Sequence, residues 1–394
     1  MLIRAYLHNA TWRRIVNLLR CRLSYALSCA GIVRVRHLPE FISVEPADWC
    51  MLRCAECPVG QASGGRARHT LSPGLFRRLL DQTGDRLHTV QFFFQGEPLL
   101  CRQLPELIAE AAERGIVSIV STNAQLLTPQ LAEQLLRAGL NKIIVSIDGL
   151  TQSSYEVYRA GGSLERALAG LRAVADARER TGSRVEIELQ CLRLRSNEHE
   201  WERFRREYRR LGATKLSMKT AQIIDFRSGS DLLPSDSRYV RYRIGKDGEW
   251  HRKKAYRNRC ARLWSGCVVD AEGQVLPCCF DKRREHVLGR IEEQSFQDIW
   301  FGEEADRFRK TIVQRREAVE MCKNCSECAC GGEIALCGCE LFQGKLNLHN
   351  WKSCRNFAGG RNRGFRAREK CGLPPIKYAT DAALSETDIN IKHY

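Results

Sequence analysis

The amino-acid sequence predicts an α/β fold, a partial (β/α)6 TIM-like barrel followed by a small cysteine-rich C-terminal domain. Short apolar runs rich in β-forming residues alternate with amphipathic helical runs between residues 41 and 223. The alternation stops near residue 224, and 12 of the 19 cysteines lie from Cys260 onward. Because six β/α units are fewer than the eight of a closed barrel, we expect a barrel that is open on one side.

Six strands are predicted, and each is followed or preceded by a helical pattern. This alternation favours a parallel sheet with right-handed crossovers. The strands span Phe41–Glu45, Thr89–Phe94, Val117–Ser121, Lys142–Ile147, Arg184–Leu194 and Lys215–Lys219. The helical patterns begin at Ser72-Pro73 and at Thr128-Pro129, and cover Gln103–Arg114 and Glu198–Leu211.

Composition divides the chain into five segments. We expect a basic helical segment over residues 1–40, the barrel over 41–224, a connector over 225–259, the cysteine-rich domain over 260–354 and a basic tail over 355–394. Two short runs in the cysteine-rich segment, Cys267–Val269 and Gln274–Leu276, flank Ala271-Glu272-Gly273 and predict a β-hairpin.

The formal net charge is +17, and three segments hold the excess of positive charge. Residues 1–39 contain seven arginines and no acidic residue, and residues 251–262 contain six basic residues and no acidic residue. Residues 355–371 contain six basic residues and one glutamate. Such segregation favours an acidic partner: a peptide, a nucleic acid or membrane headgroups. Solubilising tails and a solvated face explain it equally well.

Neither a secretory signal nor a transmembrane span is predicted near the N-terminus. Arg13, Arg14, Arg20 and Arg22 interrupt every apolar run there. We therefore expect a cytoplasmic protein. In that reducing compartment, clustered cysteines indicate metal binding or catalysis more often than disulfides.

The stretch from residue 12 to residue 20 is amphipathic. Trp12, Ile15, Val16 and Leu19 share one helical face, with arginines around them. We expect this helix to pack across the open side of the barrel. The alternative is contact with a membrane surface.

Three cysteines, Cys50, Cys54 and Cys57, follow the first predicted strand with the spacing C-x3-C-x2-C. Three thiolates on a short loop can bind three irons of a [4Fe–4S] cluster and leave the fourth iron open. A structural zinc site usually has four ligands on two knuckles, and therefore suits this spacing less well.

Several stretches beside this triplet resemble the radical S-adenosylmethionine superfamily, whose members carry C-x3-C-x2-C after the first strand of a partial barrel. Two positions depart from the family pattern: Glu56 replaces an aromatic residue, and Gln95 replaces the first glycine of G-G-E-P. The matching stretches fall at successive strand ends: Phe94-Gln95-Gly96-Glu97-Pro98-Leu99, Ser121-Thr122-Asn123, Ser146-Ile147-Asp148-Gly149, then Tyr155, Tyr158-Arg159 and Gly161-Gly162-Ser163.

The resemblance implies a [4Fe–4S] cluster on Cys50, Cys54 and Cys57 that binds S-adenosyl-L-methionine. Taken singly, the matching residues also have structural explanations: Asp148-Gly149 as a turn, Arg159 as a surface cation and Ser121-Thr122-Asn123 as a helix cap. The implied cofactor-binding residues are Gly96 and Glu97 at the methionine amino group, Arg159 at its carboxylate, and Asn123, Ser146 and Asp148 at the ribose or the methionine.

The cysteine-rich segment resembles the SPASM or twitch extension of that superfamily. Cys260, Gly273 and Cys278 match its C-x9-15-G-x4-C opening. The resemblance implies at least one auxiliary [4Fe–4S] cluster, with Cys260, Cys278, Cys322 and Cys325 as ligands. Two further alternatives stay open: a second cluster drawn from Cys325, Cys328, Cys330, Cys337, Cys339 and Cys354, and a zinc site on Cys322, Cys325, Cys328 and Cys330.

The resemblance implies an enzyme, a radical SAM oxidoreductase or maturase that cleaves S-adenosylmethionine reductively to a 5′-deoxyadenosyl radical and abstracts hydrogen from a substrate. We expect a peptide or protein side chain as substrate and a reductant such as flavodoxin or ferredoxin as partner. A small molecule, a sugar or an RNA base is the alternative substrate. A non-catalytic iron–sulfur or zinc module that binds nucleic acid is the alternative of another class. The sequence names no catalytic acid or base.

Overall fold

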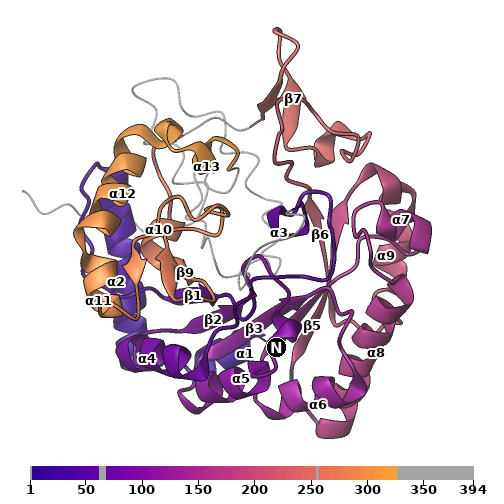
Figure 1. Cartoon of the computed structure of the whole chain (residues 1–394), viewed down its shortest axis with the longest axis horizontal. Coiled ribbons are helices and arrows are strands. Elements are labelled where there is room, and N and C mark those ends of the chain that lie inside the picture. Colours follow the sequence, from indigo (N-terminus) through magenta and orange to yellow (C-terminus); the bar gives the residue numbers. More distant parts are fainter. Residues whose placement is uncertain (1, 62–67, 254–256, 326–394) are drawn as a thin grey trace, which may run out of the picture. The chain divides into compact units, whose positions relative to one another are not determined.

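The computed structural model describes residues 2–61, 68–253 and 257–325. Within these residues, one nine-stranded sheet has the order β11-β10-β9-β1-β2-β3-β4-β5-β6 (Figure 1). Strands β1 to β6 are parallel neighbours in chain order, so the predicted partial barrel is confirmed. They span Phe41–Val44, Thr89–Phe92, Val117–Thr122, Lys142–Ser146, Glu186–Arg193 and Lys215–Thr220.

Helices begin between the strands where capping residues satisfy the first free N–H groups. The side chains of Ser72 and Thr128 accept hydrogen bonds at the starts of α4 and α6, where a proline occupies the first turn. Glycine at position 182, with φ +65°, ends α8. These helices and their neighbours are α3 Pro58–Gln61, α4 Pro73–Thr83, α5 Leu104–Glu113, α6 Pro129–Arg137, α7 Gln152–Glu156, α8 Leu164–Thr181 and α9 Trp201–Glu207.

The helix predicted over Glu198–Leu211 is shorter than expected. A 3-10 turn occupies Arg195–Glu200, and α9 ends at Glu207. Asn197 in this turn donates to the backbone carbonyls of Asp148 and Leu192, at 2.7 and 2.8 Å. These bonds to the ends of two strands hold the chain in a tight turn before the α-helix begins.

The cysteine-rich segment joins the barrel sheet directly. Strand β9 (Gly266–Val269) pairs in parallel with β1, and β10 (Gln274–Leu276) returns antiparallel beside it, which confirms the predicted hairpin. Strand β11 (Gly289–Arg290) then pairs with β10. Gly266 lies opposite Phe41, and a Cβ atom at Gly266 would lie 2.4 Å from that ring. The segment continues through α10 Arg262–Ser265, α11 Phe296–Phe301, α12 Glu303–Arg315 and α13 Glu320–Lys323.

The connector contains structure that the sequence did not predict. Strands β7 (Tyr242–Ile244) and β8 (Trp250–Arg252) form a separate two-stranded hairpin (Figure 1). Buried Tyr242 fixes it: its hydroxyl accepts from the Ile223 backbone N–H at 3.0 Å and bonds Asn324 Oδ1 at 2.9 Å. The hairpin is therefore tied both to the end of β6 and to the turn after α13.

The N-terminal segment forms α1 (Leu2–His8) and α2 (Trp12–Cys29). The expectation that the residue 12–20 helix packs across the open side of the barrel is wrong. Buried Arg14 donates to the backbone carbonyls of residues 84, 114 and 115, which precede β2 and β3. Asn17 likewise bonds the carbonyl of Leu38, before β1. Polar groups on α2 thus hold it against the amino ends of the strands.

The interior of the barrel is filled at its amino end. Leu2 and Tyr6 of α1 cluster with Val117, Ile119 and Ile144 of β3 and β4. Beside them, the fully buried Lys142 pairs with Glu188 at 2.8 Å. Because this end is packed, the carboxyl ends of the strands are where a substrate can approach.

Among the described residues, none of the helices combines the length and the apolar content needed to cross a bilayer.

Candidate active site at the carboxyl ends of the strands

The predicted cysteine triplet lies on a fixed loop after β1. The backbone N–H groups of Arg53 and Ala55 donate to the carbonyls of Ala160 and Tyr158, at 2.9 and 3.1 Å. Cys54 is buried, and Cys50 and Cys57 are half-buried beside it in one apolar cluster. The loop therefore presents three thiols against the segment that follows α7.

Two polar side chains contact the sulfur atoms. Asn123 Nδ2 lies 3.4 Å from Cys50 Sγ, and Arg159 Nη1 lies 3.8 Å from Cys54 Sγ. Burial raises the pKa of the Cys50 thiol to about 12, and burial also raises the pKa of Cys54 against the opposing effect of Arg159. A metal ion or cluster must displace these protons to bind thiolates. Three clustered thiols, two of them with side-chain N–H donors at the sulfur, fit a thiolate-bound iron–sulfur cluster.

Glu97 is a buried carboxylate at the end of β2. Its Oε1 accepts from Thr122 Oγ1 at 2.5 Å and from the Leu99 N–H at 3.2 Å, and its Oε2 accepts from the Asn123 N–H at 2.9 Å. Burial raises the pKa of Glu97, and these donors oppose that shift. Because a carboxylate oxygen can accept two hydrogen bonds, Oε2 retains room for one further donor such as an ammonium group.

Gly96 permits the close approach of this strand end to the cysteine loop. A Cβ atom there would lie 1.9 Å from the Ala47 carbonyl oxygen. The next residue, Glu97, donates its N–H to the Trp49 carbonyl at 2.9 Å. Only glycine lets the two backbones meet in this way.

Asp148 and Arg159 form a buried ion pair beside the cysteine loop. Arg159 Nε donates to Asp148 Oδ2 at 2.6 Å, and the Leu192 N–H donates to Asp148 Oδ1 at 2.6 Å. Burial alone would lower the pKa of Arg159, but the Asp148 carboxylate and the Cys54 sulfur together raise it well above its usual value. The guanidinium thus stays charged and fixed beside a sulfur atom.

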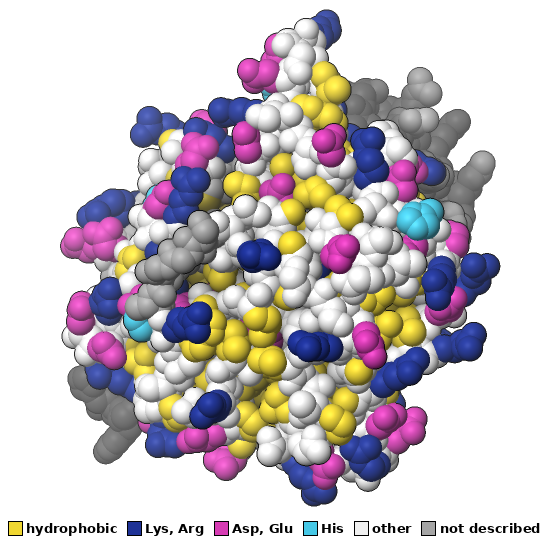
Figure 2. All heavy atoms as spheres, turned by 45° about the vertical axis from the view of Figure 1, so that its right-hand side comes forward, with side chains coloured by type: hydrophobic (Ala, Val, Ile, Leu, Met, Phe, Trp, Pro, Cys, Tyr) yellow, Lys and Arg dark blue, Asp and Glu magenta, His cyan; other side chains and the backbone are white. Residues whose placement is uncertain are grey.

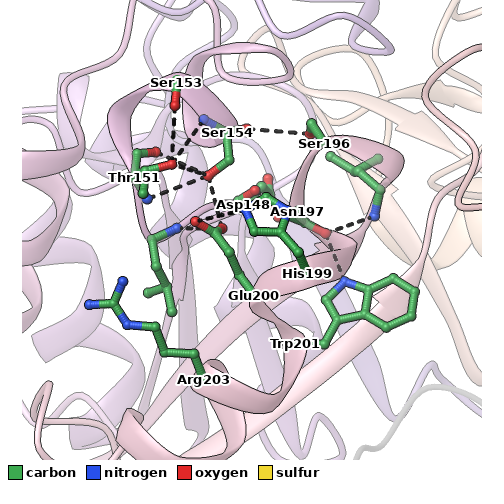
Figure 3. A network of polar contacts seen from close by, with 12 residues as sticks. Asp148, Thr151, Ser153, Ser154, Ser196, Asn197, His199, Glu200, Trp201 and Arg203 are labelled. Atoms are coloured by element: carbon green, nitrogen blue, oxygen red, sulfur yellow. Dashed lines mark hydrogen bonds and ion pairs between the residues drawn. The ribbon is translucent and has the colours of Figure 1, made fainter.

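A network of polar side chains behind Asp148 supports this pair (Figure 3). Glu200 Oε2 accepts from Ser154 Oγ at 2.8 Å and from the Leu150 N–H at 2.8 Å. Asn197 binds the carbonyl of Asp148 at 2.7 Å and accepts from Trp201 Nε1 at 2.8 Å. The network ties the turn after β4 to the turn after β5.

The structure brings five of the six predicted cofactor-binding residues into this arrangement. Gly96 and Glu97 adjoin the cysteine loop at the end of β2, Asn123 lies at Cys50, and Asp148 and Arg159 lie near Cys54. The sixth, Ser146, is buried at the end of β4 and pairs in register with Gln190 of β5.

The two departures from the family pattern bind other parts of the chain. Glu56 accepts from the Ile224 N–H at 2.7 Å, which links the cysteine loop to the segment after β6. Gln95 Nε2 donates to the Lys282 carbonyl at 2.9 Å, which links the end of β2 to the cysteine-rich segment.

Sequence reasoning missed a buried cluster formed by Glu45, Arg284 and Asp270. Arg284 contacts Glu45 at 3.1 Å and Asp270 at 2.8 Å. Glu45 also accepts from the Gly96 N–H at 3.3 Å, and burial raises the pKa of Glu45 to about 7 against the effect of Arg284. The signal available in the sequence was Glu45 itself, an acidic residue at the end of the mostly apolar first predicted strand.

The predicted auxiliary ligands lie in two pairs. Cys260 and Cys278 are close enough to interact electrostatically, and a hydrogen bond with Cys279 together with burial raises the pKa of Cys278. Cys322 and Cys325 share one turn, closed by a 3.1 Å bond from the Cys325 N–H to the Cys322 carbonyl. The other cysteines proposed for a second cluster or a zinc site, Cys328, Cys330, Cys337, Cys339 and Cys354, lie outside the described residues.

Comparison with known proteins matches two stretches of the chain to described domains. Residues 44–185 match the radical SAM superfamily, and residues 260–326 match SPASM, an iron–sulfur cluster-binding domain. These matches cover the chain from the last residue of β1 through the cysteine loop and β4, and the segment from Cys260 to the turn after α13.

Relatives extend along most of the chain. An AdoMet-dependent heme synthase of Methanosarcina barkeri is 24% identical over 336 residues, which is 75% of this chain and 90% of the relative. A PqqA peptide cyclase of Granulibacter bethesdensis is 24% identical over 333 residues, 77% of this chain and 83% of the relative. The crystal structure of Streptococcus suis SuiB bound to S-adenosylmethionine shares the fold, with a TM-score of 0.54, 14% identity, and coverage of 74% of this chain and 72% of that one.

The radical SAM match implies a [4Fe–4S] cluster with S-adenosylmethionine, and the SPASM match implies auxiliary iron–sulfur clusters. With the partial barrel and the strand-end motifs in place, the chain belongs to the radical SAM superfamily as an enzyme with a C-terminal SPASM domain.

Proposed function

We propose that the chain binds its radical-generating [4Fe–4S] cluster through Cys50, Cys54 and Cys57 and uses it on a peptide or protein side chain. The observation that supports cluster binding by these three cysteines is the fixed loop, with Asn123 at the Cys50 sulfur and Arg159 at the Cys54 sulfur. When bound, the cluster and S-adenosylmethionine supply a 5′-deoxyadenosyl radical that abstracts a substrate hydrogen.

The residues around the loop have separate tasks in this proposal. Glu97 Oε2 accepts the methionine ammonium, and Gly96 keeps that carboxylate close to the cysteine loop. Arg159, oriented by Asp148, neutralises the methionine carboxylate and the thiolate at Cys54. Asn123 donates at Cys50, and Ser146 and Asp148 face the ribose or the methionine.

For the extension, we propose one auxiliary [4Fe–4S] cluster on Cys260, Cys278, Cys322 and Cys325. The pairing of Cys260 with Cys278, and of Cys322 with Cys325, supports this ligand set. We also propose that the chain divides into domains as the sequence predicts, with boundaries after residues 40, 224, 259 and 354. A flavodoxin or ferredoxin in the cytoplasm would supply the electron.

A peptide substrate is supported by the edge of the sheet beside the site. Among the described residues, no strand pairs with the outer edge of β6. Five of the six β6 residues are half-buried and one is exposed. An unpaired edge presents a row of N–H and C=O groups that an extended chain can bind. A small-molecule substrate is the second candidate, because the heme synthase relative covers the chain as fully as the peptide cyclase does.

Anaerobic reconstitution tests the radical chemistry. With dithionite and S-adenosylmethionine, the enzyme should form 5′-deoxyadenosine, and Cys54→Ala should abolish it. Undiminished product in Cys54→Ala would refute the proposed cluster site. Iron counting in the Cys50/Cys54/Cys57 triple alanine variant tests the extension: about four residual irons support one auxiliary cluster.

Isotope transfer tests the substrate class. Extracts of cells grown in deuterated medium are separated into peptide and metabolite fractions and offered to the reconstituted enzyme. A peptide substrate should transfer deuterium to 5′-deoxyadenosine, and protease treatment of the fraction should remove the transfer. Transfer from the metabolite fraction, unaffected by protease, would favour the small-molecule alternative.

A further inference from the structure

The helix α2 packs on the protein through a mostly polar face and exposes an apolar one. The residues that face the protein are Arg14, Asn17, Cys21, Ser24 and Ser28, spaced three and four positions apart. Their bonds reach the backbone: Asn17 Nδ2 donates to the Leu38 carbonyl at 2.9 Å, and Cys21 Sγ to the Trp264 carbonyl at 3.2 Å. A helix docked through such bonds does not need its apolar face for packing.

The opposite face of α2 is an exposed apolar stripe. Trp12, Ile15, Leu19 and Leu23 repeat with the spacing of one helical face and are 75%, 41%, 61% and 61% exposed. A contiguous row of large apolar side chains on the surface marks an interaction site, because water contact is unfavourable for it.

The charges around this apolar stripe are all basic within the N-terminal segment. Residues 1–39 contain seven arginines and no acidic residue, and Arg4, Arg13 and Arg20 are exposed. Two nearby carboxylates of neighbouring elements are paired, Asp85 with Arg13 at 3.1 Å and Asp81 with Arg114 at 2.7 Å, whereas no described carboxylate pairs with Arg4 or Arg20. By contrast, Figure 2 shows a face on which basic and acidic side chains stand side by side.

We propose that α2 is an interfacial anchor that binds the headgroup region of an anionic phospholipid membrane. The apolar stripe would enter the boundary between headgroups and acyl chains, and the arginines beside it would bind lipid phosphates. An apolar face flanked by basic residues, on a helix that does not span the bilayer, has this chemistry.

A cavity at the carboxyl end of α2 adds two more arginines. It has a volume of about 380 Å³, and its lining includes Ser28, Cys29, Arg257 and Arg259. Arg316 donates to the Arg259 carbonyl at 2.9 Å, which fixes the loop that carries both arginines. The guanidinium groups of these two arginines can pair with a phosphate group at the end of the helix.

Charge disfavours a second copy of this chain as the occupant. A two-fold dimer through α2 would place the same patch against itself. Arginines would then meet arginines, with no acidic residue of the segment to pair with them. Phospholipid phosphates supply the missing negative charge.

Vesicle binding tests the proposal on the reconstituted full chain. The protein should co-sediment with vesicles of phosphatidylcholine and phosphatidylglycerol, and less with phosphatidylcholine alone, and binding should weaken as salt is raised. Leu19→Glu and Leu23→Glu should each reduce the binding roughly tenfold or more. Ile244→Glu is the matched control, because Ile244 on β7 is also 61% exposed, and it should bind like the parent protein.

Two further measurements separate the alternatives. Brominated lipids should quench part of the tryptophan emission, and Trp12→Phe should remove that part. The Arg257→Gln/Arg259→Gln variant should lower the salt dependence of binding. Absence of vesicle binding, or equal binding by Leu19→Glu, would overturn the proposal. A dimer that Leu19→Glu dissociates would also overturn it, because a second copy of the chain would then cover the stripe. A thermal midpoint lowered by Leu19→Glu and unchanged by Ile244→Glu would overturn it too, because other residues of the same chain would then cover the stripe.

Discussion

The missing side chain of Gly96 allows the end of β2 to approach the cysteine loop closely. At Gly96 the space for a Cβ atom is taken by the Ala47 carbonyl oxygen, 1.9 Å away. Neither backbone can move freely, since Glu97 is bonded on one side to Trp49 and on the other to Asn123. The geometry of the site thus depends on the absence of one methyl group.

We expect Gly96→Ala to lower the free energy of unfolding by about 3 kcal/mol, because the methyl group forces two backbone segments apart. Iron bound at the Cys50 loop should fall as well. Urea unfolding and iron analysis after anaerobic reconstitution measure both effects. Gly74→Ala is the control, because nothing lies within 4 Å of the added Cβ. Equal behaviour of the two variants would contradict the close approach.

Asp148→Asn should leave Arg159 buried without its charged partner. We expect a loss of about 3 kcal/mol in unfolding free energy and weaker S-adenosylmethionine binding, measured by urea unfolding and by equilibrium dialysis. Asparagine can still accept from the Leu192 N–H, so the loss reports the ion pair. Glu133→Gln is the control: its partner Arg137 is 71% exposed, and the change should stay below about 1 kcal/mol. A comparable loss in both variants would argue against the buried pair.

The sequence predicted the site residues that directly follow strands, because the barrel collects those positions at one end. Glu97, Asn123 and Asp148 belong to this class. Glu45 and Asn197 were missed for a physical reason: their partners are set by packing between distant segments. Arg284, which contacts Glu45, lies 239 positions away in the chain.

Elements at the amino ends of the strands hold two histidines in the neutral form, of which His37 is buried and His88 half-buried. Burial lowers the pKa of His37 to about 4, and burial lowers the pKa of His88 to about 4. His88 stacks on Tyr6 of α1 with ring centroids 4.4 Å apart. The contact between α1 and the start of β2 therefore depends on an uncharged imidazole.

The contribution of these two histidines to stability should fall as the pH drops from about 6.5 toward 4, because their imidazoles bind protons in the unfolded chain at a higher pH than in the folded protein. Each histidine contributes about 2 kcal/mol to that loss at pH 5. His88→Phe keeps the stack on Tyr6 and should reduce the loss by that amount. Urea unfolding of both proteins from about pH 5 to about pH 7.5 measures the difference between their unfolding free energies, which should change with pH below about 6.5 and stay constant above pH 7. A constant difference across this range would contradict the linkage.

At the level of elements, the six barrel strands and the β9–β10 hairpin were predictable from alternation and turn residues. The position of α2 was not, because its apolar pattern suggested packing through Ile15 and Leu19 while the structure docks it through Arg14 and Asn17. The β7–β8 hairpin escaped prediction because its strands are only three residues long and half of their residues are arginine or histidine. Helix amphipathicity alone does not say which face meets the protein.

In the whole molecule, the barrel and the extension share one buried charge cluster. Arg284 has φ +58° and spans Glu45 at the end of β1 and Asp270 after β9. The same Glu45 accepts from the N–H groups of Gln95 and Gly96. The loop after Cys278 is thereby bonded, through Glu45, to the strand end that forms the proposed cofactor site.

Arg284→Met should leave two buried carboxylates without their charged partner and lower the unfolding free energy by about 3 kcal/mol. Binding of S-adenosylmethionine should weaken too, although Arg284 lies outside the cysteine loop. Arg283→Met is the adjacent control, since that side chain is 77% exposed. Unfolding and ligand titration of both variants provide the comparison, and an unchanged affinity in Arg284→Met would disprove the coupling.

The parallel pairing of β9 with β1 also limits how this protein can be engineered. Truncation before Cys260 would strip a partner strand from the centre of the sheet and leave β1 with a bare edge. Such an edge recruits strands from other chains, so the shortened protein should aggregate or exchange strands instead of persisting as a smaller enzyme. A chimera that borrows an extension from a relative must therefore supply a small residue opposite Phe41, where this chain has Gly266.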